Sequence, residues 1–465
     1  MTNVTVSFPR TVPRPSFTAV VFALVLAGDG TAQAARDIEV IVGQAVGMSV
    51  DRPPLIHVEP HLAVSPRDPK FLVGAVMVFA PPDYVPRLAG YISRDGGRTW
   101  TPSDHPKPPH DSSNPWPGLF DPWTAVAGDG TVYMSGLQLS QQGGEIYLWR
   151  SRDAGGEWDH PLRLPHGTGG SFDHPVILTV PADGATDILY VFANQGARGL
   201  TRGAFGNSLL RSADRGATFS SPVMILPNNF NNHNGNIAAL SDGALVASWF
   251  EIEATGTPVI RRRRLWVSLS TDGGETFLPS HLVVEGYAAG WPVVDVDLSR
   301  NGRRDRIYIA WTGIEDSTGN TDERAFVAWS DDRGVNWVDP KAVHARSKSL
   351  SNVMLAVSPE GIVGVSWYES DGDCTRLVFA ASADRGESFS DPAPVSERWC
   401  PDPAREANRV PLPGGWMVYE RWPTGGDYHG LAARPGGEFY ALWVDGSMGV
   451  FQLQGTRIHV IVPEE

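Results

Sequence analysis

Six copies of one eight-residue pattern, Ser-x-Asp-x-Gly-x-x-Trp/Phe, constrain the fold of this chain more than any other feature. Successive copies are 58, 61, 58, 60 and 52 residues apart. One such window arises by chance with a probability on the order of 10⁻⁵, so six at a nearly constant step indicate a repeat architecture. The copies begin at Ser93, Ser151, Ser212, Ser270, Ser330 and Ser382.

The chemistry of the pattern predicts a hairpin turn. Short apolar runs flank it, such as residues 265–268 before the fourth copy and residues 222–226 after the third. In such a turn the Asp carboxylate accepts hydrogen bonds from backbone amides, the Gly adopts a positive φ, and the closing aromatic ring packs back onto the sheet. We therefore interpret the six Asp residues as structural and assign none of them to catalysis.

The spacing of the turns predicts an all-β fold. The chain contains 50 glycines and 38 prolines, which suit many short strands, and no long segment has a helical period. Seven comparable starts of inner strands predict a seven-bladed β-propeller of four-stranded antiparallel blades, with a six-bladed ring as the alternative. We expect residues 35–465 to form this single domain, and its last blade, residues 430–457, to close the ring against a strand at residues 38–43.

Charge and the N-terminal segment bear on partners and compartment. The net charge of −14 argues against nucleic acid or an anionic membrane surface as a partner. Residues 1–34 resemble a secretory signal peptide, with an apolar run at 17–27 and a small-x-small cleavage site at 32–34. A disordered start is the alternative. No run is long enough to span a bilayer, so we expect a secreted or periplasmic monomer without a membrane span.

Topology predicts which end of the propeller carries the chemistry. If the Asp turns join the third and fourth strands of each blade at one face, the inner strands begin at the opposite face. Residues at these starts should converge on the central axis, and arginines on neighbouring strands are further candidates for substrate contacts. The candidate substrate-binding residues are Glu59, His61, Asp121, Asp173, His174, Asn234, Trp291, Asn352, Arg264, Arg324, Arg376, Asp427 and His429.

Carboxylates, tyrosines and arginines pooled at one mouth suit the cleavage of a glycosidic bond. One acid protonates the leaving oxygen, and a second group stabilises the oxocarbenium-like centre. Crowding also separates the pKa values of neighbouring carboxylates, as acid and base roles require. The alternative is that these polar side chains only cap strand ends that face a watery channel. The basic run Arg261 to Arg264 could bind an anionic sugar, or it could be a solvated face.

The six turns resemble the Asp boxes, or bacterial neuraminidase repeats, of sialidase-like β-propellers, over about residues 55–457. This resemblance implies that Asp83 is the acid/base, that Glu251 is the assisting carboxylate, and that Tyr368 or Tyr428 is the nucleophile. The Arg-Ile-Pro segment of sialidases is absent, because residues 58–61 read Val-Glu-Pro-His. Its loss argues against sialic acid itself as the substrate.

Metal and cofactor patterns are missing from the sequence. It contains no zinc-ligand spacing, P-loop or dinucleotide-binding glycine pattern, so we expect no cofactor. His61, His174, His233 and His429 lie near acidic or amide residues but lack the short-range spacing of metal ligands.

The two cysteines, Cys374 and Cys400, are predicted to form a disulfide near the mouth, as is usual for an exported chain with an even cysteine count. Two free thiols are the alternative. Taken together, the residues favour a secreted, sialidase-like glycoside hydrolase that acts on a glycan. A non-catalytic glycan- or protein-binding propeller and a polysaccharide lyase are the competing interpretations.

Overall fold

The structure is a computed structural model, and it describes residues 38–49, 55–109, 118–140, 143–166, 170–182, 187–196, 205–225, 232–255, 260–286, 290–300, 304–314, 323–344, 349–372, 374–400, 410–411, 417–447 and 449–463. The predicted signal peptide, residues 1–34, lies outside these ranges. Within them, no helix is long and apolar enough to cross a membrane.

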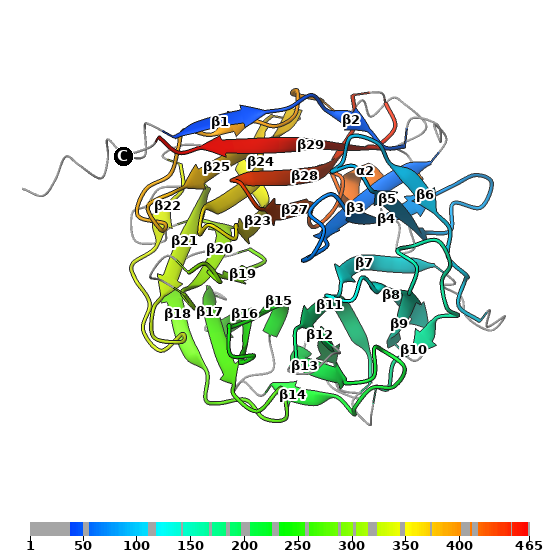
Figure 1. Ribbon diagram of the computed structural model, residues 1–465, viewed down its shortest axis with the longest axis horizontal. Coiled ribbons are helices and arrows are strands. Elements are labelled where there is room, and N and C mark those ends of the chain that lie inside the picture. Colours follow the sequence, from blue (N-terminus) through cyan, green and yellow to red (C-terminus); the bar gives the residue numbers. More distant parts are fainter. Residues whose placement is uncertain are drawn as a thin grey trace, which may run out of the picture.

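Seven antiparallel sheets surround a central axis as the blades of a propeller (Figure 1). The seven-bladed, all-β prediction is confirmed. Blade one contains β3 (Ile56–Val64), β4 (Leu72–Phe79), β5 (Arg87–Ser93) and β6 (Thr101–Ser103). Blade two contains β7 (Leu119–Val126), β8 (Val132–Ser140), β9 (Gly143–Ser151) and β10 (Leu162–Arg163). Blade three contains β11 (Phe172–Val180), β12 (Ile188–Gly196), β13 (Phe205–Ser212) and β14 (Val223–Ile225).

Blades four to six have the same strand order. Blade four contains β15 (Asn232–Ala239), β16 (Leu245–Thr255), β17 (Ile260–Ser270) and β18 (His281–Glu285). Blade five contains β19 (Val293–Val296), β20 (Ile307–Gly313), β21 (Arg324–Ser330) and β22 (Lys341–Ala342). Blade six contains β23 (Ser349–Val357), β24 (Val363–Asp371), β25 (Cys374–Ser382) and β26 (Ala393–Pro394).

Blade seven joins the two ends of the chain. It contains β27 (Gly430–Arg434), β28 (Glu438–Asp445) and β29 (Gln452–Ile461), and a short helix, α2 (Val418–Arg421), precedes it. The N-terminal strands β1 (Glu39–Val42) and β2 (Val46–Gly47) both pair with β29, and Glu39 lies opposite Ile461. The predicted closure of the ring by the N-terminal strand is therefore confirmed.

Each of the six Asp turns is fixed by the same set of hydrogen bonds. The Ser hydroxyl donates to Oδ1 of the Asp. It also accepts from the amide of the Gly, at N to Oγ distances of 2.8–2.9 Å. The same Asp oxygen accepts the amide four residues further along. These turns join the third and fourth strands at one face, so the inner strands begin at the other face, which we call the mouth.

Large aromatic side chains fill the space between blades at repeated positions. Trp249, Trp311, Trp367 and Trp443 occupy equivalent places in the second strands of blades four to seven, and all four are fully buried. Replacing one such ring by alanine typically costs about 3–5 kcal/mol of stability. A core of this kind holds the blades rigidly and fixes where each inner strand begins at the mouth.

Candidate functional site

The inner strands share a β-bulge at the mouth. The pairing of the first two strands shifts register at this point in blades one, two, three, four and six. In four of them a non-glycine residue of the bulge adopts a left-handed conformation: Glu59, Asp121, His174 and Asn352, with φ of 57°, 51°, 47° and 55°.

A proline follows three of these residues, at positions 60, 122 and 175. Proline has no amide hydrogen to donate to the sheet ladder, so within sheets it is confined to edges, strand starts and bulges. A left-handed non-glycine residue costs on the order of 1–3 kcal/mol, and such strain gathers at functional sites. The repeated bulge therefore identifies the mouth as the candidate site.

An acidic pocket of about 370 Å³ opens at the mouth. This volume lies in the range of small-molecule sites, roughly 300–1,000 Å³. It is lined by Glu59, Phe120, Asp121, Leu137, Leu139, Asp173, His174, Arg421, Trp422 and Asp427. The sequence predicted the convergence of its four carboxyl groups and His174 from blades one, two, three and seven.

Two carboxyl groups in this pocket, Glu59 and Asp121, are deeply buried, with 1% and 7% of their surface exposed. Burial raises the pKa of Asp121 to about 6; His174 opposes this rise, and Asp173 and Asp427 add to it. Burial likewise raises the pKa of Glu59 well above its ordinary value, and the Asp121 and Asp427 charges raise it further. The two carboxyl groups thus raise each other's pKa, because two buried carboxylates at short range repel each other.

His174 lies between two carboxylates. Its Nδ1 is 3.7 Å from Asp121 and its Nε2 is 3.8 Å from Asp173. Burial by itself would lower the pKa of His174, but Asp173 and Asp121 outweigh it and raise that pKa. The three side chains are of metal-ligating types, with ligand atoms within 4.8 Å of one another. Since each ring nitrogen faces a different carboxylate, an imidazolium that pairs with both accounts for this arrangement.

Arg421, at the end of α2, fixes Asp427. Its two terminal nitrogens donate to the two carboxylate oxygens of Asp427 at 2.8 and 2.5 Å. This bidentate geometry gives a strong and well-oriented ion pair. The guanidinium also lies 5.1 Å from the ring centroid of Trp422.

The segment from residue 422 to 429, which we call the axial loop, connects several blades. The Gly425 carbonyl accepts the Glu59 amide at 2.8 Å, and the Gly426 carbonyl accepts the Asn352 side chain at 2.6 Å. The Tyr428 hydroxyl donates to the Pro122 carbonyl at 2.9 Å. One loop is thus tied to the bulges of blades one, two and six.

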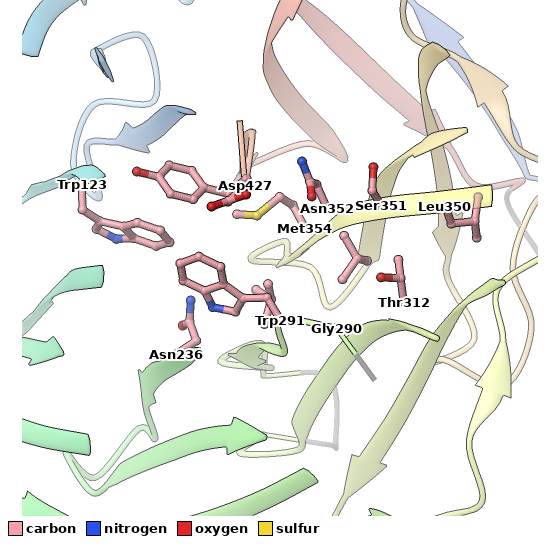
Figure 2. A pocket seen from close by; sticks show the side chains of 13 residues that line it. Trp123, Asn236, Gly290, Trp291, Thr312, Leu350, Ser351, Asn352, Met354 and Asp427 are labelled. Atoms are coloured by element: carbon pink, nitrogen blue, oxygen red, sulfur yellow. The ribbon is translucent and has the colours of Figure 1, made fainter. Parts of the chain in front are cut away.

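A second pocket, of about 130 Å³, adjoins the first and shares Asp427 with it. Figure 2 shows the indole rings of Trp123 and Trp291 beside each other, with Asp427 and Asn352 on the same pocket. The Tyr428 ring meets both indoles edge-on, at centroid distances of 5.4 and 5.7 Å. Flat aromatic faces next to polar groups are suited to stacking against a sugar ring.

Two further predicted residues form the layer below the pockets. His61 stacks on Trp123 at 3.7 Å and accepts the Thr124 amide, and burial lowers its pKa to about 3. His429 is fully buried against Ser366, and burial lowers its pKa to about 3 as well. Both imidazoles are neutral at ordinary pH and support the pocket walls.

Other candidates lie on the mouth face without lining either pocket. Asp83, in the loop between β4 and β5, is half-exposed and pairs with Arg87 at 2.7 Å. Glu251 accepts the Trp266 indole hydrogen at 2.8 Å. Tyr368 is buried against the His429 ring, and burial raises its pKa.

The predicted arginines have partners on their own blades or lie at a strand end. Arg264 pairs with Glu285 at 3.2 Å, and Arg376 pairs with Glu369 at 2.8 Å. Arg324 begins β21. The side chain of Asn234 falls outside the described residues, although its backbone lies in the bulge of blade four.

Sequence reasoning did not identify Arg421, Trp422 or Trp123 as part of the site. Arg421 and Trp422 precede the blade that lacks an Asp box, so no turn was available to set their register. A signal was nevertheless present, since an Arg-Trp-Pro segment stands just ahead of Gly425, Gly426 and Asp427. Paired glycines before a candidate acid indicate a chain that must pass close to another backbone.

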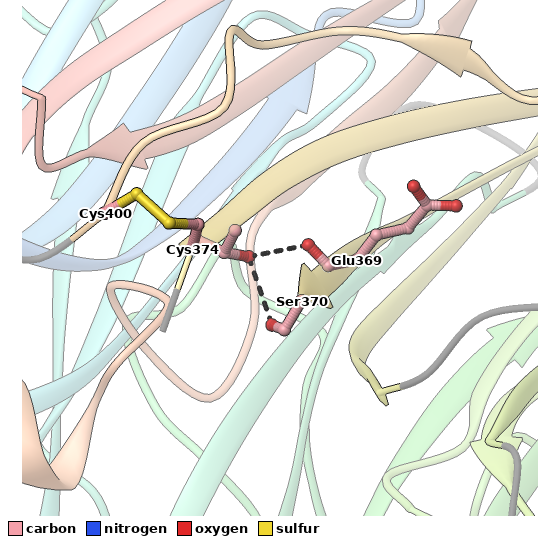
Figure 3. The surroundings of a disulfide bond; sticks show 5 residues. Glu369, Ser370, Cys374 and Cys400 are labelled. Carbon is pink, nitrogen blue, oxygen red and sulfur yellow. Dashed lines mark hydrogen bonds between the residues drawn. A yellow bond between two sulfur atoms is a disulfide. The ribbon is translucent and has the colours of Figure 1, made fainter. Parts of the chain in front are cut away.

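The two cysteines form a disulfide close to the mouth, 26 residues apart in the sequence (Figure 3). Cys374 begins β25, and the adjacent Thr375 exchanges two backbone hydrogen bonds with Trp399. The Thr375 hydroxyl also donates to the Glu369 carbonyl at 3.1 Å. The disulfide thus anchors the start of the segment that leads to α2 and Arg421.

Comparisons with known proteins agree with this architecture. A family model described as the BNR/Asp-box repeat matches residues 91–102. None of the curated proteins matches the chain. Among solved structures, a protein of unknown function from Dyadobacter fermentans DSM 18053 is 12% identical, with a TM-score of 0.50, covering 91% of this chain and 99% of that one.

An ulvan lyase from a new family of polysaccharide lyases is also 12% identical, with a TM-score of 0.51, covering 89% of this chain and 95% of that one. A mutant of the NanB sialidase from Streptococcus pneumoniae is 11% identical, with a TM-score of 0.46, covering 68% and 65%. At such identities the likeness concerns the fold alone. Six Asp boxes on a ring of seven antiparallel blades thus give this chain the architecture of an Asp-box, or BNR-repeat, β-propeller.

Proposed function

We propose that the protein is a glycoside hydrolase that cleaves a glycan at the mouth, with the Glu59–Asp121 pair as the acid and Asp427 as the second carboxylate. The observation that carries this proposal is a buried carboxyl pair with raised pKa values, in one pocket with a carboxylate held by an arginine. Two carboxyl groups in unlike environments are what acid and base roles in glycoside cleavage require.

The buried pair suits the donation of a proton to the leaving oxygen. Because the pKa of Asp121 is raised to about 6 and that of Glu59 well above its ordinary value, we expect the pair to carry a proton in mildly acidic solution. An acid whose pKa lies close to the working pH donates most effectively, and such a group contributes roughly 10²–10⁴ in rate. Glu59 lines the pocket, and its Oε2 is buried without a hydrogen-bond partner.

Asp427 suits the opposite role. Its bidentate partner Arg421 fixes its orientation. An ionised carboxylate close to the anomeric carbon stabilises the positive charge that develops there or activates the attacking water. The Trp123 and Trp291 rings of the adjoining pocket offer a platform for the sugar ring.

The second candidate function is a non-catalytic glycan-binding propeller. The edge-on cluster of Trp123, Trp291 and Tyr428 favours it, because stacking on aromatic rings is sufficient for binding. The two functions differ in whether Asp121 and Glu59 are needed for turnover or only for the shape of the pocket.

An activity panel on the purified chain separates these functions. Glycans would be assayed for new reducing ends, which report cleavage by either a hydrolase or a lyase, and for the ultraviolet absorbance of an unsaturated product, which only a lyase forms. We expect new reducing ends, and a fall in kcat of roughly 10²–10⁴ for Asp121→Asn and for Glu59→Gln, with the fold retained by circular dichroism. Asp83→Asn tests the assignment implied by the family resemblance.

The outcomes are distinct. Loss of activity in Asp83→Asn with retention in Asp121→Asn would return the acid role to the loop between β4 and β5. Tight glycan binding without turnover by the unmodified chain would support the binding propeller. New reducing ends that appear together with the absorbance of an unsaturated product would support a lyase.

The proposal includes export to an oxidising compartment. The disulfide between Cys374 and Cys400 supports it, since structural disulfides persist mainly in secreted and periplasmic proteins. The N-terminal sequence of the mature protein would test it, and we expect cleavage after residue 34. Recovery of an uncleaved chain from the cytoplasm would count against export.

A further inference from the structure

We infer that the mouth acts as an electrostatic filter, which binds sugars that are uncharged or carry an amino group and rejects sugars that carry a carboxylate or a sulfate. This inference rests on the site of the proposed function and names its substrate class. It excludes an anionic sugar, which was considered from the sequence, as the substrate.

The first observation is the charge of the acidic pocket. Four carboxyl groups line it, against one arginine and one histidine. The arginine donates both terminal nitrogens to Asp427, and the histidine lies between Asp121 and Asp173. The two positive groups of this pocket are therefore already matched to carboxylates.

The second observation is the buried oxygen of Glu59. Its Oε2 has no hydrogen-bond partner, and the Glu59 side chain is 1% exposed. Since the Glu59 carboxyl group lines the pocket, a sugar hydroxyl or an ammonium group that enters meets a hydrogen-bond acceptor there, whereas a carboxylate or sulfate has no hydrogen to donate. An anion in this pocket would lose its hydration and meet like charges at short range, where the low dielectric of the interior strengthens repulsion.

The third observation is the aromatic pocket that shares Asp427. The rings of Trp123, Trp291 and Tyr428 surround it, and a carboxylate closes one side. Electron-rich ring faces beside a carboxylate attract an organic ammonium group. An amino group on the bound sugar therefore gains favourable contacts from both pockets.

The basic run in blade four has two described side chains, Arg263 and Arg264, and neither changes the charge of the two pockets. Arg264 pairs with Glu285 and lies 3.8 Å from Glu251, and Arg263 packs over the Phe250 ring. Neither arginine lines either pocket. The anion-binding role considered for this run from the sequence thus has no support at the mouth.

Matched monosaccharides test the filter without turnover. Methyl glycosides of glucosamine, glucose and glucuronic acid share one ring and differ in the charge of one substituent, and the galactose series gives a second matched set. Binding to the unmodified chain would be measured by ligand-observed nuclear magnetic resonance and by calorimetry. In at least one series we expect the amino sugar to bind about tenfold or more tightly than the uronic acid, with the neutral sugar between them.

Two variants report on the cause. Asp173→Asn removes a carboxylate from the pocket. It should reduce, several-fold, the ratio of the affinity for the amino sugar to the affinity for the uronic acid. Asp339→Asn removes an exposed carboxylate beside an Asp box and should leave the ratio unchanged. Equal or tighter binding of the uronic acid would overturn the inference, as would the absence of amino-sugar binding in both series.

The readout separates this inference from the proposed function. Preference for the amino sugar with no hydrolysis of any glycan would support the filter and contradict the hydrolase. Hydrolysis of a glycan with preference for its uronic acid would support the hydrolase and contradict the filter.

Discussion

The two faces of the propeller both hold non-glycine residues in the left-handed region, and they use them differently. At the Asp-box face these are Ala154, Arg215, Arg333 and Arg385, each directly after the Asp of a turn. At the mouth four of them, Glu59, Asp121, His174 and Asn352, each lie in the bulge of an inner strand. The local backbone strain is similar, so the difference lies in what surrounds the carboxyl groups.

Aspartates at the Asp boxes are surrounded by donors. Side-chain and backbone hydrogen bonds from Thr218 lower the pKa of Asp214 to about 2, and Thr276 has the same effect on Asp272. At the mouth, burial and neighbouring carboxylates raise the pKa of Glu59 and Asp121 instead. One face uses carboxylates to close turns, and the other raises the pKa of its carboxyl groups by burial.

The axial loop offers the sharpest test of how tightly the mouth is built. A Cβ on Gly426, whose φ is 148°, would lie 2.6 Å from the Glu59 amide nitrogen and 2.7 Å from its Cα. We expect Gly426→Ala to lower the free energy of unfolding by about 2–4 kcal/mol and to lower kcat. Denaturant titration and the hydrolysis assay would measure the two effects.

Gly436→Ala is the matched control for this change. Gly436 also has a positive φ, of 81°, but nothing lies within 4 Å of its added Cβ. Its cost should be the backbone strain alone, about 1 kcal/mol, with kcat unchanged. Equal effects of the two variants would show that the close approach between Gly426 and Glu59 does not matter.

At the Asp-box face, replacing the aspartate of one turn should lower stability without changing turnover. Asp214→Asn weakens the hydrogen bonds from Ser212, Ala217 and Thr218. Since the turn is largely exposed to water, we expect a loss of about 1–2 kcal/mol in the free energy of unfolding and an unchanged kcat. A tenfold fall in kcat at full stability would contradict the structural role of this face.

The smallest expected effect is that the stability contributions of Asp121 and Asp214 change with pH in opposite directions. The pKa of Asp121 is raised, so its contribution to stability is full below its unfolded pKa, near 3.8, and is lost as the pH rises through about 6. The pKa of Asp214 is lowered, so its contribution is full above 3.8 and is lost as the pH falls through about 2.

Melting temperatures measured from pH 3 to 8 would show this contrast. Asp121→Asn should raise the melting temperature by a few degrees near neutral pH and by little near pH 4. Asp214→Asn should lower it near neutral pH, with a smaller effect as the pH approaches 2. Parallel pH profiles for the two variants would mean that the two faces do not differ in the way described.

Periodicity explains what could be predicted from the sequence. The Ser, Asp and Gly of each box make contacts within five residues, so each turn is a local event that the sequence encodes directly. The step between boxes indicated the repeat, seven inner-strand starts predicted the number of blades, and the position of the Asp turns placed Glu59, Asp121, Asp173, His174 and Asp427 at the opposite face.

The rest depended on contacts between distant segments. Arg421 reaches the mouth from α2, and Tyr428 donates to the Pro122 carbonyl, 306 residues away in the sequence. Asp83 lies in the expected loop but pairs with Arg87 four residues along. Neither the path of the axial loop nor the partner of a loop carboxylate has a period, so neither could be read from spacing.

Closure of the ring by its first and last strands sets the time at which the mouth is completed during synthesis. Strand β1 is made first but pairs with β29, which is made last, so the ring cannot close until almost the entire chain exists. The axial loop belongs to the same late blade, and it supplies the Gly425 carbonyl that accepts the Glu59 amide. In a growing or truncated chain we therefore expect Glu59 and Asp121 to be hydrated, with ordinary pKa values. Their pKa values rise only when the last blade is in place and buries them.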